Sequence, residues 1–333
     1  MEMLLINVGS SSLKAQRTSD GHEKHYRALH THKDYAHAIR DLITTIGPFS
    51  YAVHRIVHGA GQTKTAYFTR RTRRHIEKGC SAAPLHNIPQ LHVLDTLEAY
   101  RKTHKLRFRQ ICVFDSLPFA FSDELRDYPI PRKIASKHGI VRVGFHGLSH
   151  TYMRQQTTEH KIITVHLGSG CSVSGFVGKR AIYNSMGFTP LQGIIMATRS
   201  GTIDPGIILT LARHGYDAKT LDHMLNHESG WKAICGETEF LKILEKRHPG
   251  NRHDLAYRMF VRSVSSEIAN ALLAVRGART IIFSGEIGAQ SRHVRNDVLK
   301  ESRIFGRFKH RAVHADEQAI LKEEAEALIG QSR

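Results

Sequence analysis

Three short apolar runs, each followed by a polar residue and then by small residues, stand out along the chain. They read LLIN-VGSSS from Leu4, IITVH-LGSGCS from Ile162 and TIIFS-GEIGA from Thr280. A short apolar run that ends in a turn is typical of a buried strand. The pattern therefore predicts three strands that each run into a tight turn.

Two of these strands are followed by a returning strand. Leu4–Asn7 leads through a small-residue turn to Lys14–Thr18, and Ile162–His166 leads in the same way to Ser172–Val177. Strand, turn and returning strand thus occur twice, about half a chain apart. This favours two related α/β halves with a cleft between them.

Helical patterns alternate with the strands. One begins at Asn87 with Pro89, a longer one runs from about Asp254 to Arg276, and the last begins after Asp316 and ends before Gly330. Their apolar stripes are most simply read as core. We also interpret Gly147, between His146 and His150, as an argument against a helix there.

Length and composition agree with a folded protein of about two domains. The chain has 333 residues, of which 41% are hydrophobic and 23% charged. Its 26 glycines and 9 prolines are too few for a collagen-like or low-complexity sequence. Fibrous and disordered classes are therefore excluded.

Basic residues outnumber acidic residues by a wide margin, 48 against 30, which gives a formal net charge of +18. This balance favours anionic partners. The basic runs at 70–74, 102–109 and 303–311 are scattered, and no recognition helix or aromatic RNA-binding signature accompanies them. We therefore interpret the charge as solvated surface, with nucleic-acid binding as the less favoured alternative.

The cysteines and the start of the chain indicate the compartment. Cys80, Cys112, Cys171 and Cys235 form no CxxC pair, which is typical of reduced thiols in a cytoplasmic protein. The apolar stretch Met3–Ile6 is shorter than the core of a signal peptide, and no later run approaches membrane-spanning length. We expect neither export nor a membrane.

Two glycine- and serine-rich turns, GSSSLK and HLGSGCS, could let backbone N–H groups and hydroxyls approach a phosphate. Neither fits GxxxxGK[ST], and neither fits GxGxxG at the start of a helix. Each turn alone is therefore a weak signal.

Eight ordered segments change this picture. In order they are NVGSSSLK, HRIVHGAG, APLHNIP, VFDS, GFHGLSH, HLGSGCSVS, SMGFTPLQG and ATRSGTIDPG, from Asn7 to Gly206. Together they resemble the acetate and propionate kinase family, and the resemblance extends to the final helix.

The resemblance implies an α/β fold of two duplicated ribonuclease H-like (actin-like ATPase) domains around a central cleft. The expected domains are 1–118 plus 318–333, and 119–317. The implied reaction is the reversible transfer of a phosphoryl group from ATP to a short-chain carboxylate, giving an acyl phosphate and ADP. The implied cofactor is Mg²⁺ or Mn²⁺, and the implied assembly is a homodimer.

Four catalytic residues carry over from the matching motifs. Arg55 in HRIVHG and Arg199 in ATRSG would hold the carboxylate and the phosphoryl group, a task that suits a planar guanidinium. His146 in GFHGLSH would stabilise the phosphoryl group, and Asp115 in VFDS would organise the metal and the arginines. Such groups match phosphoryl transfer, which requires positioning and positive charge.

Without the resemblance, each of these residues has a simpler reading. Asp115 could cap a turn, Arg55 could form a surface ion pair, and Arg199 could be a loop cation. His146 and His150 have the spacing of two helical metal ligands, but the glutamate of HExxH is absent. We therefore do not predict a zinc site there.

The resemblance also implies metal and phosphate contacts. Asn7 and Glu317 would complete the surroundings of the metal through oxygen ligands or their waters. Ser10, Ser12 and Lys14 belong to the first phosphate turn. The remaining nucleotide and phosphate contacts are His166, Gly168, Ser169, Gly170, Glu239, Phe240, Glu286, Ile287, Gly288, Ala289 and Gln290.

A small apolar substrate pocket maps onto Val57, Leu85, Phe145 and Pro190, whose alternative reading is ordinary core. A short acyl chain should fit. One methylene changes binding by only about 1–3 kcal/mol, so the sequence does not separate acetate from propionate.

The chain departs from the family pattern in its nucleotide motifs. Ser169 stands where the family has asparagine, Leu241 where it has arginine, and Glu286 where it has glycine. The chain is also shorter than typical members. Three readings follow: an ATP-dependent acyl kinase with a divergent purine pocket, the same chemistry with pyrophosphate or another donor, or a non-catalytic protein that binds phosphate or nucleic acid.

Overall fold

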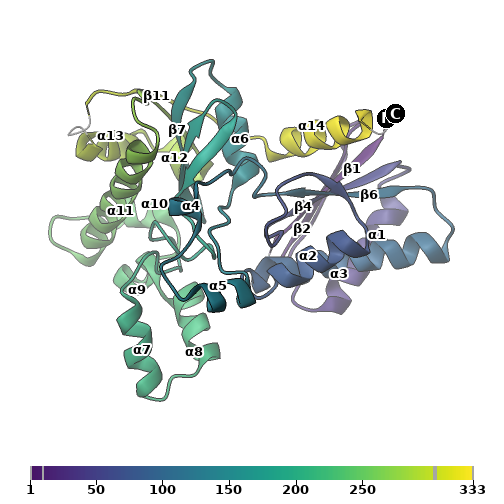
Figure 1. The fold of residues 1–333 in the computed structure, drawn as a ribbon, viewed down its shortest axis with the longest axis horizontal. Helices are drawn as coiled ribbons and strands as arrows, with labels where there is room; N and C mark the ends of the chain where they lie inside the picture. The colour runs from purple at the N-terminus through teal and green to yellow at the C-terminus, as the bar shows by residue number, and fades with distance from the viewer. Residues whose placement is uncertain (1, 10, 303–305, 332–333) are drawn as a thin grey trace. The chain divides into compact units, whose positions relative to one another are not determined.

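The computed structural model describes residues 2–9, 11–302 and 306–331. The chain divides into two compact units (Figure 1). Unit 1 comprises Met1–Pro118, Phe145–Leu148 and Asp316–Arg333, and unit 2 comprises Phe119–Gly144 and Ser149–Ala315. The sequence analysis had placed 145–148 and 316–317 in the second domain, whereas their contacts group them with unit 1.

Unit 1 is built on a six-stranded sheet with the order β3-β2-β1-β4-β6-β5. β1, β2 and β3 form an antiparallel meander, while β1, β4 and β6 run parallel to one another. The short β5 closes the far edge in the antiparallel sense. The strands are β1 Met3–Val8, β2 Leu13–Arg17, β3 Glu23–Tyr26, β4 Tyr51–Ile56, β5 Ala66–Tyr67 and β6 Arg109–Phe114.

Four helices accompany this sheet: α1 His32–Thr45, α2 Arg70–Gly79, α3 Pro84–Thr103 and α14 Glu317–Gly330. α1 and α3 lie on one side of it and α14 on the other (Figure 1). Ile39 of α1 and Leu97 of α3 share a buried cluster with Leu4 and Ile6 of β1. Both faces of the parallel strands are thus covered, which explains why these strands are almost continuously apolar.

Unit 2 repeats the same strand plan. Its sheet has the order β11-β10-β7-β8-β9, in which β7, β8 and β9 form an antiparallel meander and β7, β10 and β11 run parallel. The strands are β7 Lys161–Leu167, β8 Cys171–Val177, β9 Arg180–Asn184, β10 Thr280–Ser284 and β11 Lys309–Ala312. The predicted pair of related α/β halves is confirmed.

The helices of unit 2 are more numerous, and α6 starts in unit 1 and continues into unit 2 after Leu148. α11 packs against β8, where Val275 and Ala271 lie over Gly175. The helices are α4 Asp123–Arg126, α5 Arg132–His138, α6 Gly147–Gln155, α7 Pro205–Arg213, α8 Ala218–His223, η1 Met224–Glu228 (a π-helix), α9 Gly230–Cys235, α10 Phe240–Lys246, α11 Arg252–Ala274, α12 Gly285–Gln290 and α13 Arg292–Glu301.

Three predicted helices are present with shifted ends. The helix expected from Asn87 begins at Pro84 and continues through Pro89, the long helix ends at Ala274, and Asp316 caps α14 as expected. The prediction that Gly147 argues against a helix is wrong, because α6 begins there. A side chain at Gly147 would collide with the backbone oxygen of Asp115, so glycine is needed for this close approach rather than for breaking the helix.

Within the described ranges, no helix has both the length and the apolar composition that crossing a membrane would require. Cys80, Cys112, Cys171 and Cys235 are free thiols.

Candidate functional site

Three polar residues lie where the parallel strands of unit 1 end. Asn7 is near the end of β1, Arg55 near the end of β4, and Asp115 directly follows β6. Because these strands are neighbours and run parallel, their carboxyl ends meet at one edge of the sheet. That edge is the usual position of ligand sites in α/β sheets.

Arg55 is the centre of an ion cluster at this edge. Its Nη2 lies 2.7 Å from Oδ2 of Asp115, and its Nε lies 3.1 Å from Oδ1 of the same carboxylate. Its Nη1 lies 3.0 Å from Oε2 of Glu317, the first residue of α14. Asn7 is within 3.5 Å of both Arg55 and Glu317. Three predicted site residues, Asp115, Glu317 and Asn7, thus meet at Arg55, the fourth.

Burial makes this cluster electrostatically strong. Asp115 is 1% exposed, and burial raises the pKa of its carboxyl, an effect that Arg55 opposes and Glu317 reinforces. Burial disfavours the charged form of Arg55, but Asp115 and Glu317 outweigh it and raise the pKa of the guanidinium. Arg55 therefore stays charged, and two carboxylates fix the orientation of its guanidinium group.

His146 lies just before α6 and has an unusual backbone. Its φ is +58°, a left-handed conformation that costs energy for a residue with a side chain. The next residue, Gly147, packs on the backbone of Asp115, and the Leu148 N–H donates to the Asp115 carboxylate. The turn before α6 therefore brings His146 into the surroundings of Asp115.

The oxygen atoms of this cluster are of the kind that magnesium prefers. Asp115, Glu317 and Asn7 contribute carboxylate and amide oxygens, and with one arginine the formal charge of the group is −1. Mg²⁺ in proteins typically binds one or two carboxylates and keeps several waters or substrate phosphates. The donor set therefore fits a magnesium ion.

The predicted apolar pocket residues divide between the units. Val57 and Phe145 are 7% and 2% exposed in unit 1, and the Val57 N–H donates to Gln90 of α3, the helix that carries Leu85. Pro190 belongs to unit 2. Three of the four residues therefore belong to unit 1.

The first phosphate turn is only partly described. Ser10 lies outside the described residues. The carbonyl of Ser12 accepts a hydrogen bond from Gly9 at 2.8 Å, which closes the turn between β1 and β2. Lys14 pairs with Glu23 of β3 at 3.0 Å, so its charge is already balanced within the meander.

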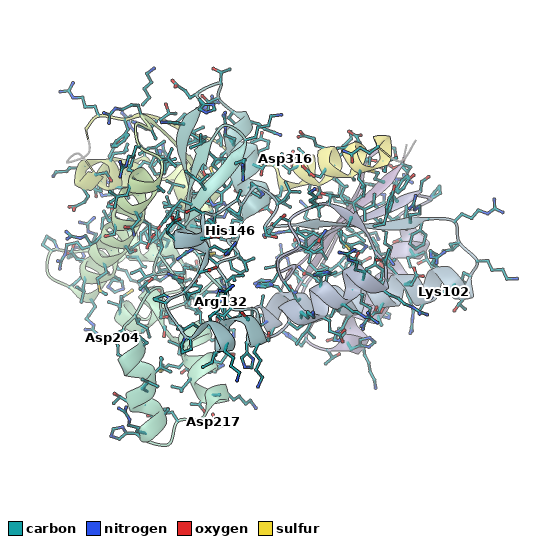
Figure 2. The ribbon with its side chains drawn as sticks, in the orientation of Figure 1. Lys102, Arg132, His146, Asp204, Asp217 and Asp316 are labelled. Carbon is teal, nitrogen blue, oxygen red and sulfur yellow. The ribbon has the colours of Figure 1, made fainter. Side chains whose placement is uncertain are left out.

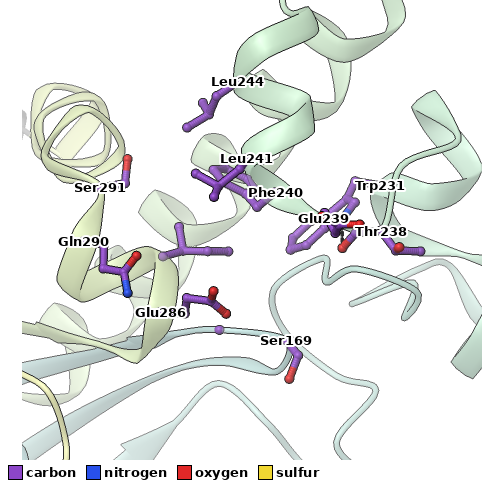
Figure 3. Close-up of a pocket in the computed structure, with 12 residues that line it drawn as sticks. Ser169, Trp231, Thr238, Glu239, Phe240, Leu241, Leu244, Glu286, Gln290 and Ser291 are labelled. Carbon is purple, nitrogen blue, oxygen red and sulfur yellow. Dashed lines mark hydrogen bonds between the residues drawn. The ribbon is translucent and has the colours of Figure 1, made fainter.

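The second turn opens onto a cavity in unit 2 of about 320 Å³ (Figure 3). Gly168 and Ser169 of the turn between β7 and β8 form one side of it. α12 packs closely there, because a side chain at Gly285 would collide with the backbone oxygen of Leu167. The remaining lining comes from α9, α10, α12 and residues next to these helices: Trp231, Thr238, Glu239, Phe240, Leu241, Leu244, Glu286, Ile287, Gln290 and Ser291.

The walls of this cavity are largely aromatic and aliphatic. Trp231 and Phe240 meet with ring centroids 5.3 Å apart, and both pack on Phe260. None of the described lining residues is basic. Glu239 pairs with Lys242 at 2.7 Å, and Glu286 adds a second carboxylate residue to the lining (Figure 3). An apolar slot with carboxylates suits an uncharged flat ring with hydrogen-bond donors.

Not every predicted nucleotide contact reaches this cavity. Gly170, Gly288 and Ala289 are absent from its lining among the described residues. The carbonyls of Gly288 and Ala289 instead accept hydrogen bonds from Arg295 at 2.9 and 2.8 Å. His166 lies beside the turn, where its Nδ1 is 2.7 Å from Ser149 Oγ.

Arg199 is the predicted cation of unit 2. Its guanidinium is desolvated, which lowers the pKa of the group, and its Nη1 lies 3.9 Å from the sulfur of Met196. Within the described chain it forms no ion pair, unlike Arg55. A half-buried arginine without a carboxylate partner among the described residues is suited to an anionic ligand.

Sequence reasoning missed Trp231, Thr238, Leu244 and Ser291 as lining residues. Trp231 was detectable as the single tryptophan of the chain, but its position gave no motif. Leu244 and Ser291 line the cavity only because α10 and α12 converge, which no local pattern encodes.

Comparisons with known proteins agree with this geometry. The family model described as the acetokinase family matches residues 18–329. An acetate kinase of Acaryochloris marina is 34% identical, over 81% of this chain and 72% of that protein. An acetate kinase of Methanosarcina thermophila is 30% identical, over 90% of this chain and 84% of that protein.

Solved structures are similar over nearly the whole chain. A propionate kinase from Francisella tularensis superposes with a TM-score of 0.85 at 23% identity, covering 97% of this chain and 98% of that one. An acetate kinase from Porphyromonas gingivalis gives a TM-score of 0.84 at 22% identity, covering 98% and 99%. The fold is thus that of the actin-like ATPase type, and the chain belongs to the acetokinase family.

Proposed function

We propose that this protein is an acetate or propionate kinase that transfers a phosphoryl group reversibly between ATP and a short-chain carboxylate. The observation that carries the proposal is the cluster in which Asp115 and Glu317 hold Arg55 in one orientation. A guanidinium fixed in this way can bind a planar anion without reorganising at the moment of reaction.

In the forward reaction, a carboxylate oxygen of the substrate attacks the γ-phosphorus, and the bond from that phosphorus to the β,γ-bridging oxygen breaks. The products are the acyl phosphate and ADP. Arg55 orients the carboxylate and the transferring group, and Arg199 supplies a second guanidinium to the phosphoryl oxygens. His146 donates a hydrogen bond to these oxygens as the bond breaks.

Asn7, Asp115 and Glu317 would hold the metal through their oxygens or through its waters. When bound, Mg²⁺ supplies positive charge to the phosphate oxygens. Asp115 then has two tasks, because the same carboxylate orients Arg55. Val57, Leu85, Phe145 and Pro190 are proposed to limit the acyl chain to a few carbons.

The cavity of unit 2 is the proposed site of the nucleoside. Phe240, Ile287 and Trp231 offer apolar contact to a base, and Glu239 and Gln290 offer polar contact to its sugar or edge. Ser12, His166, Gly168, Ser169 and Gly170 would contact the phosphates through N–H and O–H donors. Lys14 of β2 and Ser10, which lies outside the described residues, are proposed as further phosphate contacts. Glu286, Gly288 and Ala289 shape the helix end behind them.

The decisive variant is Arg55→Lys. Lysine keeps the charge but has no fork to bridge Asp115 and Glu317, so we expect kcat/KM for acetyl phosphate formation to fall by about 100-fold or more. Arg101→Lys is the matched control, because Arg101 makes a similar pair with Glu98 at 2.7 Å on the surface. Full turnover in Arg55→Lys would contradict the proposal.

A second donor is the alternative, because Leu241 and Glu286 in the described lining of the nucleoside cavity depart from the family motifs. Pyrophosphate would not need this cavity. A panel of donors from ATP to pyrophosphate separates the two readings, since ATP dependence requires the cavity and pyrophosphate dependence does not.

The variant Leu241→Arg also distinguishes ATP from a donor that does not use the cavity. The leucine is 63% exposed at the cavity, and an arginine there should lower the KM for ATP several-fold, because it adds a cation that attracts the anionic nucleotide to a described lining without one. Leu273→Arg on α11, where the leucine is 68% exposed away from the cavity, is the control. An unchanged KM for ATP in Leu241→Arg would argue for a donor that bypasses the cavity.

We further propose that the protein acts in the cytoplasm as a homodimer. Four free thiols suit a reducing compartment. Nucleic-acid binding remains the less favoured alternative, supported only by the net charge of +18. Titration with an oligonucleotide at two salt concentrations tests it, because a phosphate-backbone contact weakens steeply with salt.

A further inference from the structure

A row of buried polar side chains connects α6 to the strands behind the second phosphate turn. Ser149 and His150 of α6 are both 0% exposed, as are Thr164 of β7 and Ser172 of β8. His166 pairs with Ser172 across the two strands, two residues before the turn at 168–170. Buried polar groups that hydrogen-bond to one another fix the side chains involved.

His150 anchors α6 in this row. Its Nδ1 lies 2.8 Å from Thr164 Oγ1 and its Nε2 lies 2.8 Å from Ser172 Oγ. Burial lowers the pKa of this imidazole far below its usual value, so the ring is neutral. Both ring nitrogens are occupied by hydroxyls, and α6 is therefore held to β7 and β8 in one register.

Ser149, the residue before His150, contacts His166. Its Oγ lies 2.7 Å from Nδ1 of His166. The other ring nitrogen faces the turn, because a side chain at Gly168 would come within 3.5 Å of Nε2. One nitrogen of His166 is thus directed at α6 and the other at the phosphate turn.

A neutral imidazole has one N–H donor and one acceptor nitrogen, whereas a phosphate oxygen only accepts. The neutral ring can therefore bind a phosphate at the turn only when Nε2 carries the hydrogen. That tautomer requires Nδ1 to accept a hydrogen bond from its partner. A serine hydroxyl can supply this hydrogen bond.

We propose that Ser149 is a positioning residue that donates its hydroxyl hydrogen to Nδ1 of His166 and so holds Nε2–H toward the phosphates of the substrate. This inference rests on the proposed function for the identity of the ligand. The tautomer itself is a property of the free protein, and it can be measured without any turnover.

The first test is the nitrogen spectrum of the protein labelled with ¹⁵N-histidine, with His166 assigned by its loss in His166→Gln. We expect Nε2 to carry the hydrogen and Nδ1 to be bare but hydrogen-bonded. Hydrogen on Nδ1 in the wild-type protein would overturn the proposal, because Ser149 would then be the acceptor.

The second test compares Ser149→Ala with Ser149→Thr, which restores a hydroxyl. We expect Ser149→Ala to raise the KM for the phosphoryl donor about tenfold and to populate the other tautomer, and Ser149→Thr to recover both. Ser265→Ala is the control, because Ser265 is also buried in unit 2 but its hydroxyl donates to the Val298 carbonyl. Equal KM values in Ser149→Ala and wild type would overturn the role.

The two hypotheses fail in different ways. If the wild-type protein shows no kinase activity with any donor, the proposed function is wrong, while the tautomer measurement and its response to Ser149→Ala still stand. If activity is present but the tautomer is Nδ1–H, only the role of Ser149 is wrong. Far-ultraviolet dichroism and urea unfolding identify a variant that fails to fold.

Discussion

His54 and Arg55 are consecutive residues of β4, but burial keeps one side chain neutral while the other stays charged. The side chain of Arg55 enters the ion cluster and stays charged, whereas His54 is 2% exposed inside unit 1 and burial lowers its pKa to about 3. Successive strand residues point to opposite faces, so one position serves the site and the next serves the core.

This burial predicts an acid sensitivity of folding. The unfolded chain binds a proton at His54 below a pH of about 6.5, while the folded chain does so only near 3, so the free energy of unfolding falls as the pH drops between these values. From pH 7 to pH 5 the loss due to His54 is about 2 kcal/mol.

Urea unfolding at pH 7 and pH 5 measures this loss. We expect His54→Leu to lose about 2 kcal/mol less than wild type over that interval. His138→Leu, at the exposed end of α5, should retain the wild-type pH dependence. Identical pH dependence in His54→Leu and wild type would show that His54 is not the group responsible.

At the level of single residues, the family motifs were enough to predict the ion cluster. Asp115, Arg55, Asn7 and Glu317 are far apart in sequence, and their contact could be expected only through the resemblance. The motifs did not encode the contacts that other predicted residues make. Lys14 pairs with Glu23 because β3 lies next to β2, and the Gly288 carbonyl accepts from Arg295 because α13 follows α12.

At the level of elements, strands were easier to predict than helix ends. The apolar runs at Leu4, Ile162 and Thr280 all became buried strands, because a short apolar run between turns has few alternatives. Pro89 was placed near a helix start, but the helix already begins at Pro84 and includes it. The start of α6 at Gly147 depends on packing against Asp115, which local sequence does not contain.

The N-cap of α14 couples an element to the site. The Asp316 side chain accepts a hydrogen bond from the Ala319 N–H at 3.0 Å, and the next residue is Glu317 of the ion cluster (Figure 2 labels Asp316). Loss of the cap should therefore loosen both the helix and the carboxylate that holds Arg55.

We expect Asp316→Ala to lower the free energy of unfolding by about 1 kcal/mol and to raise the Mg²⁺ concentration required for half-maximal activity several-fold. Asp217→Ala is the matched control, since Asp217 caps α8 by accepting from Thr220 at 2.7 Å (Figure 2). It should lose similar stability and keep its Mg²⁺ dependence. The same Mg²⁺ dependence in both variants would show that the cap acts only on stability.

At the level of the molecule, α7 is the least covered apolar element of unit 2. None of its described residues is buried, although its sequence is PGIILTLAR, and Ile207 and Leu209 are 48% and 57% exposed. Together with α8 it projects from the rest of unit 2 (Figure 1). Exposed apolar surface of this kind is typical of an interface, and it supports the proposed homodimer.

The test is the molar mass in solution. We expect light scattering after size-exclusion chromatography to give a dimer for the wild type and a monomer for Leu209→Glu, because a buried unpaired carboxylate disfavours association. Ile134→Glu on α5, where the isoleucine is 50% exposed, should remain a dimer. A dimeric Leu209→Glu would move the interface elsewhere.

The chain composes unit 1 from three separate segments, of which α14 is the last. On the ribosome, the strands of unit 1 are made first, yet the helix that covers one face of their sheet emerges only after all of unit 2. Until then Arg55 and Asp115 lack Glu317, and the apolar surface that receives Ile320 and Leu321 is uncovered. Unit 2 can mature during synthesis, whereas the arginine cluster can be completed only after it, so nascent chains should depend on chaperones at their N-terminal half.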